Sequence, residues 1–216
     1  MKKILLLFTI FYLSHSLVAQ ENDVFTHRAL GIELEYPSYW KMYSFSNKYK
    51  DLDYNSLSRE EIREMIRLSA ISPIFFIRKY EEVYYGINPS IRINVYRIPD
   101  YLYLHDAVIK DIFIDIFIDD FINYILSLSR KNSNNYIIDE TIYIDNVEVI
   151  YRKIFDYAVY GDTNYDERFE RYTEYYIIKR YEYGFFIIIE MTYGKNNIDD
   201  QEEIQRIVDT IRILGN

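Results

Sequence analysis

The sequence predicts an α+β fold in which an antiparallel sheet of about six to seven strands is covered by helices. Three observations support this prediction: apolar residues alternate in most segments, short turns join those segments, and two other segments have helical spacing. The 216 residues include no Cys, six Gly and four Pro. The chain must therefore be stabilised by core packing, and disulfides, zinc-cysteine sites and Cys nucleophiles are excluded.

Residues 1–19 have the pattern of a secretory signal peptide. A short cationic start is followed by an apolar run over residues 4–13, which is too short to span a membrane. Cleavage is expected after Ala19, and it leaves a single globular domain over residues 20–216. We expect a secreted or periplasmic protein without stable membrane insertion and without a lipid anchor, the alternative being an uncleaved N-terminal anchor.

The charge and the motifs restrict the function further. The net charge is −9, which opposes binding to nucleic acid because phosphate backbones attract Lys and Arg. The sequence contains no Walker loop, no dinucleotide-binding glycine motif and no H-E-x-x-H motif. Only His27 and His105 remain after cleavage, so we expect no cofactor and no catalytic residue.

The mature chain begins with a polar segment, which we expect to be flexible and to include His27. Residues 31–36 then alternate with period two, which predicts a half-buried strand. Pro37 interrupts this strand, and extended structure resumes at Trp40. We interpret Tyr36, Pro37 and Trp40 as a structural motif.

Residues 47–72 are predicted to be a helical insertion. Ser58 and Glu61 have the spacing of a capping box, in which each side chain bonds the backbone N–H of the other residue. Two strands are predicted after the insertion, over residues 74–80 and 91–98.

Residues 104–128 contain many Ile and Phe, but their spacing predicts a helix. One polar residue recurs every four positions, at Asp111, Asp115, Asp119, Asn123 and Ser127. We expect this stripe to be a solvated edge of the helix. The remaining residues are apolar, which predicts packing against the sheet.

The second half of the chain predicts a meander and a closing helix. Strands are expected over residues 137–144, 147–160, 172–181 and 185–193, with a hairpin turn at Asp145 and Asn146. The closing helix is expected to begin at Asp199 or Asp200 and to end at Gly215.

This order of elements resembles the PsbP-like α/β sandwich superfamily. The resemblance rests on the Tyr-Pro-Ser-x-Trp corner of residues 36–40, the long helix, the segment of residues 142–149 and the closing helix of residues 203–212. It implies an α/β/α scaffold that docks larger partners and has no shared catalytic residues. It covers most of the mature chain, with residues 47–72 as the insertion.

Aromatic residues of the meander form a candidate surface for a partner protein. Tyr151, Phe155 and Tyr157 share one face of the strand over residues 147–160, and Tyr175 and Tyr181 of the neighbouring strand could extend that face. The alternative is ordinary cross-strand packing, because Tyr suits half-exposed strands.

One loop has part of a calcium-binding pattern. Asp162, Asn164 and Asp166 have the one-three-five spacing that begins an EF-hand loop, but the required Gly and bidentate Glu are absent. A solvated hairpin loop is the alternative to weak calcium binding by these residues and Glu170.

The sequence as a whole predicts an exported, non-enzymatic binding or accessory protein that docks an unidentified protein partner. Two alternatives remain open. One is a hydrolase or small-ligand carrier with an atypical pocket, and the other is a weak calcium-binding envelope protein.

Overall fold

The computed structural model of the chain describes residues 21–45, 73–81, 86–99, 107–128, 136–160, 167–180 and 184–214, together with Ser58, Glu60, Glu61, Glu64, Arg67 and Leu102. The predicted signal peptide and most of the predicted insertion lie outside these described residues. The predicted capping box lies within them. Ser58 N–H donates to Glu61 Oε2 at 2.7 Å, and Glu61 N–H donates to Ser58 Oγ at 3.2 Å.

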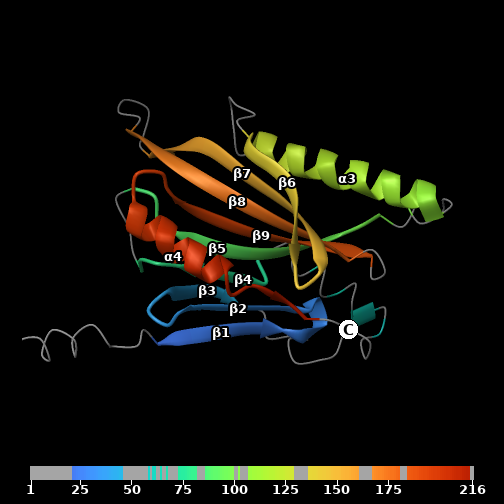
Figure 1. Ribbon diagram of the computed structural model, residues 1–216, viewed down its shortest axis with the longest axis horizontal. Helices are drawn as coiled ribbons and strands as arrows, with labels where there is room; N and C mark the ends of the chain where they lie inside the picture. Colours follow the sequence, from blue (N-terminus) through green and yellow to red (C-terminus); the bar gives the residue numbers. More distant parts are fainter. Residues whose placement is uncertain are drawn as a thin grey trace, which may run out of the picture.

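The described residues form two antiparallel sheets (Figure 1). The strands are β1 (Asn22–His27), β2 (Ile32–Pro37), β3 (Lys41–Phe45), β4 (Phe75–Arg78), β5 (Ser90–Arg97), β6 (Tyr136–Ile144), β7 (Val147–Tyr160), β8 (Glu167–Arg180), β9 (Phe185–Gly194) and β10 (Arg212–Ile213). The helices are η1 (Arg28–Leu30), α3 (Ala107–Leu128) and α4 (Ile198–Val208). The large sheet has the order β3-β4-β5-β9-β8-β7-β6, and the small sheet has the order β1-β2-β10. The predicted α+β fold with a sheet of about seven strands is confirmed.

The two faces of the large sheet are covered by different elements (Figure 1). The small sheet and α4 pack on one face, where the larger core cluster includes Ile32, Ile93, Ile187 and Ile204. Helix α3 packs on the other face, where Ile114 and Ile118 are fully buried. We call these the small-sheet face and the α3 face.

The meander has the predicted hairpin turn between β6 and β7. Asp145 and Asn146 have φ values of 49° and 64°, a left-handed conformation that Asn and Asp tolerate better than most residues. The register then pairs Val149 of β7 with Ile178 of β8 and continues to the far end of both strands. Strand β8 begins earlier than predicted, at Glu167.

The expectation of a flexible N-terminal segment is wrong. Residues 22–27 form β1, which pairs along its whole length with β2, and His27 is fully buried. Phe25 and His27 point inward while Val24 is exposed. Strand β1 has the same period-two pattern as β2, but only two of its side chains, Phe25 and His27, point inward.

The closing helix also differs from its prediction. Asn197 is the N-cap, because its side chain accepts from the N–H of Asp200 at 3.2 Å. The helix ends at Val208, and the chain then forms β10, which pairs Ile213 with Ile32. The predicted end at Gly215 lies outside the part of the chain that the structure describes.

The polar stripe of α3 is more than a solvated edge. Asp115 Oδ1 accepts from Lys179 Nζ of β8 at 2.7 Å, and Asp119 Oδ1 accepts from Arg152 of β7 at 2.8 Å. Both carboxylates remain about half exposed. The stripe therefore lies on the flank of the helix and ties it to the sheet.

Candidate functional site

The small-sheet face of β7, β8 and β9 brings together part of the predicted aromatic surface. In the β7–β8 register, Tyr151 lies opposite Tyr176, and Phe155 lies opposite Tyr172. Between these two pairs, Lys153 lies opposite Glu174. A charged pair is therefore flanked by aromatic rings.

Glu174 is the centre of this group, which we call the Glu174 cluster (Tyr151, Lys153, Glu174, Tyr176 and Tyr193). Lys153 Nζ donates to Glu174 Oε1 at 2.9 Å, and the Tyr193 hydroxyl donates to the same oxygen. The Tyr176 hydroxyl donates to Oε2 at 2.8 Å. Both carboxylate oxygens are thus occupied, and the side chain is buried.

The tyrosines of the cluster are held in their neutral form. Burial raises the pKa of Tyr151, Tyr176 and Tyr193, and the negative charge of Glu174 raises it further. A phenol with a raised pKa is a hydrogen-bond donor rather than a base or a nucleophile. The cluster therefore stabilises the sheet, and its geometry offers no activated group.

Beyond the cluster, the aromatic face becomes more exposed. Phe155 contacts Tyr157 and Tyr172, with ring centroids 5.2 and 5.9 Å apart. Lys195 Nζ lies 4.5 Å from the centroid of Phe155 and binds Glu170 at 3.2 Å. Lys195 thus covers part of the Phe155 ring, while Tyr157 remains 48% exposed.

Of the other two predicted members, the structure places only Tyr175, which does not join this surface. Tyr175 lies opposite Arg152, on the α3 face, where it is buried with Ile154 and Ile177. Neighbouring residues of a strand point to opposite faces, so Tyr175 and Tyr176 cannot share one. Tyr181 lies outside the described residues.

The predicted calcium loop lies mostly outside the described residues, since these include only Glu170 of its four candidate ligands. The Glu170 carboxylate is held by Lys195. In the described part of the chain, no group of three or more His, Asp or Glu side chains could hold a metal ion. Calcium binding by Asp162, Asn164 and Asp166 remains a prediction.

The structural motif meets the last helix at a buried carboxylate. Trp40 Nε1 donates to Glu203 Oε1 of α4 at 2.9 Å, and the Tyr39 hydroxyl donates to the same oxygen. Lys79 Nζ lies 2.6 Å from Glu203 Oε2 and 2.6 Å from Asp200 Oδ1. Tyr36 and Trp40 are both buried in the core beside this network.

The network fixes the charge states of its members. Burial alone would raise the pKa of Glu203, but hydrogen bonds from Lys79, Tyr39 and Trp40 hold it below its ordinary value. Burial alone would lower the pKa of Lys79, whereas Asp200 and Glu203 raise it. Glu203 therefore stays ionised and fully bonded.

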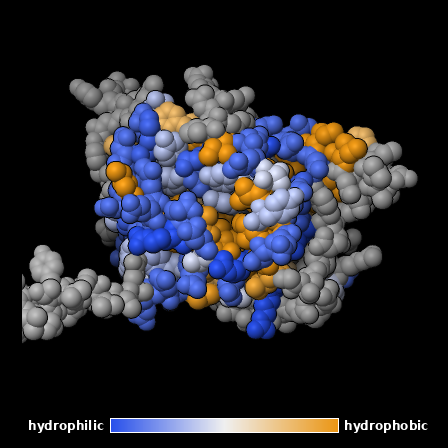
Figure 2. All heavy atoms as spheres, viewed as in Figure 1, coloured by the Kyte–Doolittle hydropathy of each residue, from blue (hydrophilic) through white to orange (hydrophobic). Residues whose placement is uncertain are grey.

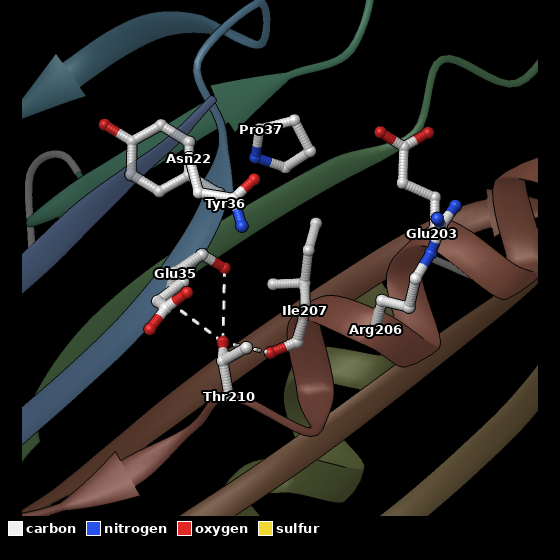
Figure 3. A pocket seen from close by; sticks show the side chains of 8 residues that line it. All are labelled: Asn22, Glu35, Tyr36, Pro37, Glu203, Arg206, Ile207 and Thr210. Carbon is white, nitrogen blue, oxygen red and sulfur yellow. Dashed lines mark hydrogen bonds between the residues drawn. The ribbon is translucent and has the colours of Figure 1, made fainter. Parts of the chain in front are cut away.

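A small pocket opens beside this network, between β1, β2 and α4 (Figure 3). Its volume is about 180 Å³, and its lining comprises Asn22, Glu35, Tyr36, Pro37, Glu203, Arg206, Ile207 and Thr210. Thr210 Oγ1 bonds the backbone N–H and carbonyl of Glu35, so that hydroxyl is already engaged. Ligand pockets usually measure roughly 300–1,000 Å³. The site is therefore small for an organic ligand, and it was not predicted because its lining residues come from regions far apart in the sequence, β1–β2 and α4 with Thr210.

The outer face of α3 exposes large apolar side chains. Ile112 and Ile116, one helical turn apart, are 55% and 49% exposed, and Phe113 beside them is also exposed. Hydrophobic surface is visible at the upper right of Figure 2, where Figure 1 places α3. The sequence pattern showed that this helix is apolar over most of its circumference and predicted that its apolar residues pack against the sheet, so the exposed side was not foreseen.

Comparison with known proteins found structural likeness and no sequence match. No protein-family model matches the chain, and no curated protein matches it significantly. Cyanobacterial PsbP (CyanoP) from Synechocystis sp. PCC 6803 is 12% identical, with a TM-score of 0.47 over 91% of this chain and 95% of that chain. The Ran-binding protein Mog1p of Saccharomyces cerevisiae is 8% identical, with a TM-score of 0.45 over 91% and 97% of the two chains. LpqN of Mycobacterium tuberculosis, which is involved in cell envelope biogenesis, is 10% identical, with a TM-score of 0.44 over 90% and 91%. The α+β fold itself rests on the strand order of this chain.

Proposed function

We propose that this chain is an exported, non-enzymatic accessory protein that binds a partner protein through the outer face of α3. The observation that carries the proposal is the exposure of Ile112 and Ile116 on a helix that is otherwise firmly attached to its sheet. A helix that is apolar over most of its circumference normally has its apolar side chains covered. Here the sheet covers only the side of Ile114 and Ile118.

The charged flank of α3 strengthens this argument. Asp115 and Asp119 are turned toward Lys179 and Arg152 of the sheet. These ion pairs fix the rotation of the helix about its axis, so the exposed isoleucines cannot turn inward without breaking them. Full burial of an exposed Ile side chain contributes about 1.5–3 kcal/mol, so covering the exposed half of Ile112 or Ile116 contributes roughly half of that.

A protein fits this surface better than a lipid membrane does. In the described part of the chain, no helix is long and apolar enough to cross a bilayer. The net charge of −9 also opposes approach to an anionic lipid surface. The exposed Asp120 near the patch favours a partner with an apolar groove and basic residues at its rim.

The non-enzymatic part of the proposal is supported by the state of the two buried glutamates. Glu174 and Glu203 each have both carboxylate oxygens occupied by donors. A general base needs a lone pair that can reach the substrate. Neither glutamate offers one in this arrangement.

The test compares three forms of the exported protein in capture from the host envelope. The wild type, the double variant Ile112→Ser/Ile116→Ser and Tyr157→Ala are each immobilised, and the recovered proteins are identified by mass spectrometry. Affinity for the recovered partner is then measured with purified components. Tyr157→Ala is the matched control, because Tyr157 is comparably exposed on the opposite side of the sheet.

We expect the double variant to lose the partner and Tyr157→Ala to keep it. Equal affinity of the wild type and the double variant would refute the α3 surface. Loss with Tyr157→Ala alone would also refute it and would assign binding to the aromatic face of β7 and β8.

A further inference from the structure

Two arginines of the α3 face share one aromatic ring. Phe76 of β4 and Arg92 of β5 lie opposite each other in register, and Arg78 follows Phe76 on the same face. The Cζ atoms of Arg78 and Arg92 lie 4.7 and 4.5 Å from the centroid of Phe76. Arg78 also lies 5.0 Å from the ring centroid of Tyr43. We call these four residues the arginine pair site.

The arginines of this site have no anionic partner within the described residues. Neither Arg78 nor Arg92 donates a hydrogen bond there, and neither forms an ion pair. Arg92 faces Glu190 in the β5–β9 register, but no ion pair joins them. Arg92 Nε is one of the few buried polar atoms of the described chain without a hydrogen-bond partner.

Other buried or half-buried cations of the described chain have polar partners, and one of them, Arg180, donates to the backbone carbonyls of Leu30 and Gly31. Lys79, Arg152, Arg171 and Lys179 each bind at least one carboxylate at 3.0 Å or less. The chain has an excess of acidic residues, 34 against 25 Lys and Arg, so carboxylates were available for pairing. Two adjacent guanidinium groups left with aromatic contacts alone are therefore an unusual feature of this fold.

The chemistry of the site suits an external carboxylate. Stacking on a ring engages the flat face of a guanidinium and leaves the N–H groups at its edge free to donate. Two such groups close together attract an anion more strongly than one, and each can bind a carboxylate through two parallel hydrogen bonds. Tyr43 adds an exposed aromatic ring that is fixed by hydrogen bonds from its hydroxyl to the carbonyls of Tyr80 and Glu81.

We infer that Arg78 and Arg92 bind carboxylate side chains of an acidic segment of the partner protein. This inference rests on the proposed function, because it names a feature of that partner. Protein interfaces are enriched in Arg, Tyr and Phe, the residue types of this site, and such residues carry much of the binding energy. On the described α3 face, the acidic segment would contact Arg78 and Arg92, which have no carboxylate partner among the described residues.

The test uses a fluorescently labelled oligo-glutamate peptide as the probe. The dissociation constant of the peptide is measured by fluorescence anisotropy for the wild type, Arg78→Gln, Arg92→Gln and Lys41→Gln. Binding of inorganic phosphate to the wild type is measured separately. Lys41→Gln removes the same charge from the neighbouring strand β3, where Lys41 is paired with Glu81. Melting curves check that each variant folds, and Arg78→Gln alone carries the test if Arg92→Gln does not fold.

We expect each arginine variant to weaken peptide binding about tenfold, and Lys41→Gln to change it less than about twofold. The double variant Ile112→Ser/Ile116→Ser should bind the peptide like the wild type, so a failure of the α3 surface is distinguished from a failure of this site. Absence of binding by the wild type, equal weakening by Lys41→Gln, or binding of phosphate without binding of the peptide would each overturn the inference.

Discussion

Trp40 donates its indole N–H to the carboxylate of Glu203 at 2.9 Å, across 163 positions of the sequence. The bond joins the corner after β2 to the middle of α4, and both residues are buried. It explains why a Trp follows the Pro corner. The ring fills the core while its polar edge binds the last helix.

The substitution Trp40→Phe keeps an aromatic ring but removes this donor. We expect the free energy of unfolding to fall by about 1–3 kcal/mol, because a charged acceptor loses a buried hydrogen bond. Urea unfolding followed by circular dichroism measures the change. A loss below about 0.5 kcal/mol would mean that the indole N–H contributes nothing of its own.

Lys79→Met should be among the most damaging single changes. It leaves Asp200 and Glu203 buried without their shared cation, at an expected loss of about 3–5 kcal/mol. Lys41→Met is the control, since the pair of Lys41 and Glu81 is largely exposed and should contribute less than about 1 kcal/mol. Similar losses in both variants would contradict the special role of Lys79.

The Glu203 network also predicts acid sensitivity. The pKa of Glu203 in the folded protein is below its ordinary value of 4.5, so the unfolded state binds the proton first as the pH falls. The stabilisation is therefore present above about pH 4.5 and is lost as the pH falls through the folded value. Urea midpoints of the wild type and Glu203→Gln should converge on acidification, and a constant difference between them would disprove this assignment.

The tyrosines of the Glu174 cluster predict the opposite behaviour at alkaline pH. Their pKa values are raised above the ordinary value of 10.0, so their stabilisation is complete below pH 10 and is lost as the pH rises through the folded values. Ultraviolet absorbance of tyrosinate should show a group that ionises only when the protein unfolds. In Glu174→Gln this group should ionise at lower pH, because the repelling charge is absent.

Ile116 and Ile118, two positions apart on α3, differ in burial, and their substitutions should therefore differ in their effect on stability. Ile118 is fully buried on the sheet side, and Ile118→Ala should cost about 2–4 kcal/mol. Ile116 is exposed, and Ile116→Ala should change the free energy of unfolding by less than about 0.5 kcal/mol. Chemical denaturation of both variants tests the orientation of the helix, and equal costs would show that this orientation is wrong.

Local patterns predicted much of this fold. The capping box of Ser58 and Glu61 and the turn at Asp145 and Asn146 depend on residues that are close in sequence, and both are present. Strand β1 was missed because a short edge strand needs only two inward residues, Phe25 and His27. Two inward residues are too few to predict a strand from the sequence of that segment alone, without its pairing to β2.

The candidate site was harder to predict, because it depends on register between strands. The alternation within β7 correctly placed Tyr151 and Phe155 on one face. The pairing of Tyr175 with Arg152, which puts Tyr175 on the other face, follows from how β7 and β8 align. The arginine pair site likewise requires β4 beside β5, a relationship that neither strand encodes alone.

The pairing of Ile213 with Ile32, together with the Glu203 network, has a consequence for how the chain reaches its native state. The N-terminal strand pair β1–β2 lacks both its covering helix and its third strand until α4 and β10 have been synthesised. Contacts between such distant segments slow folding, because a long loop must close first. The small sheet is therefore expected to form late in folding, after α4 and β10 have been synthesised.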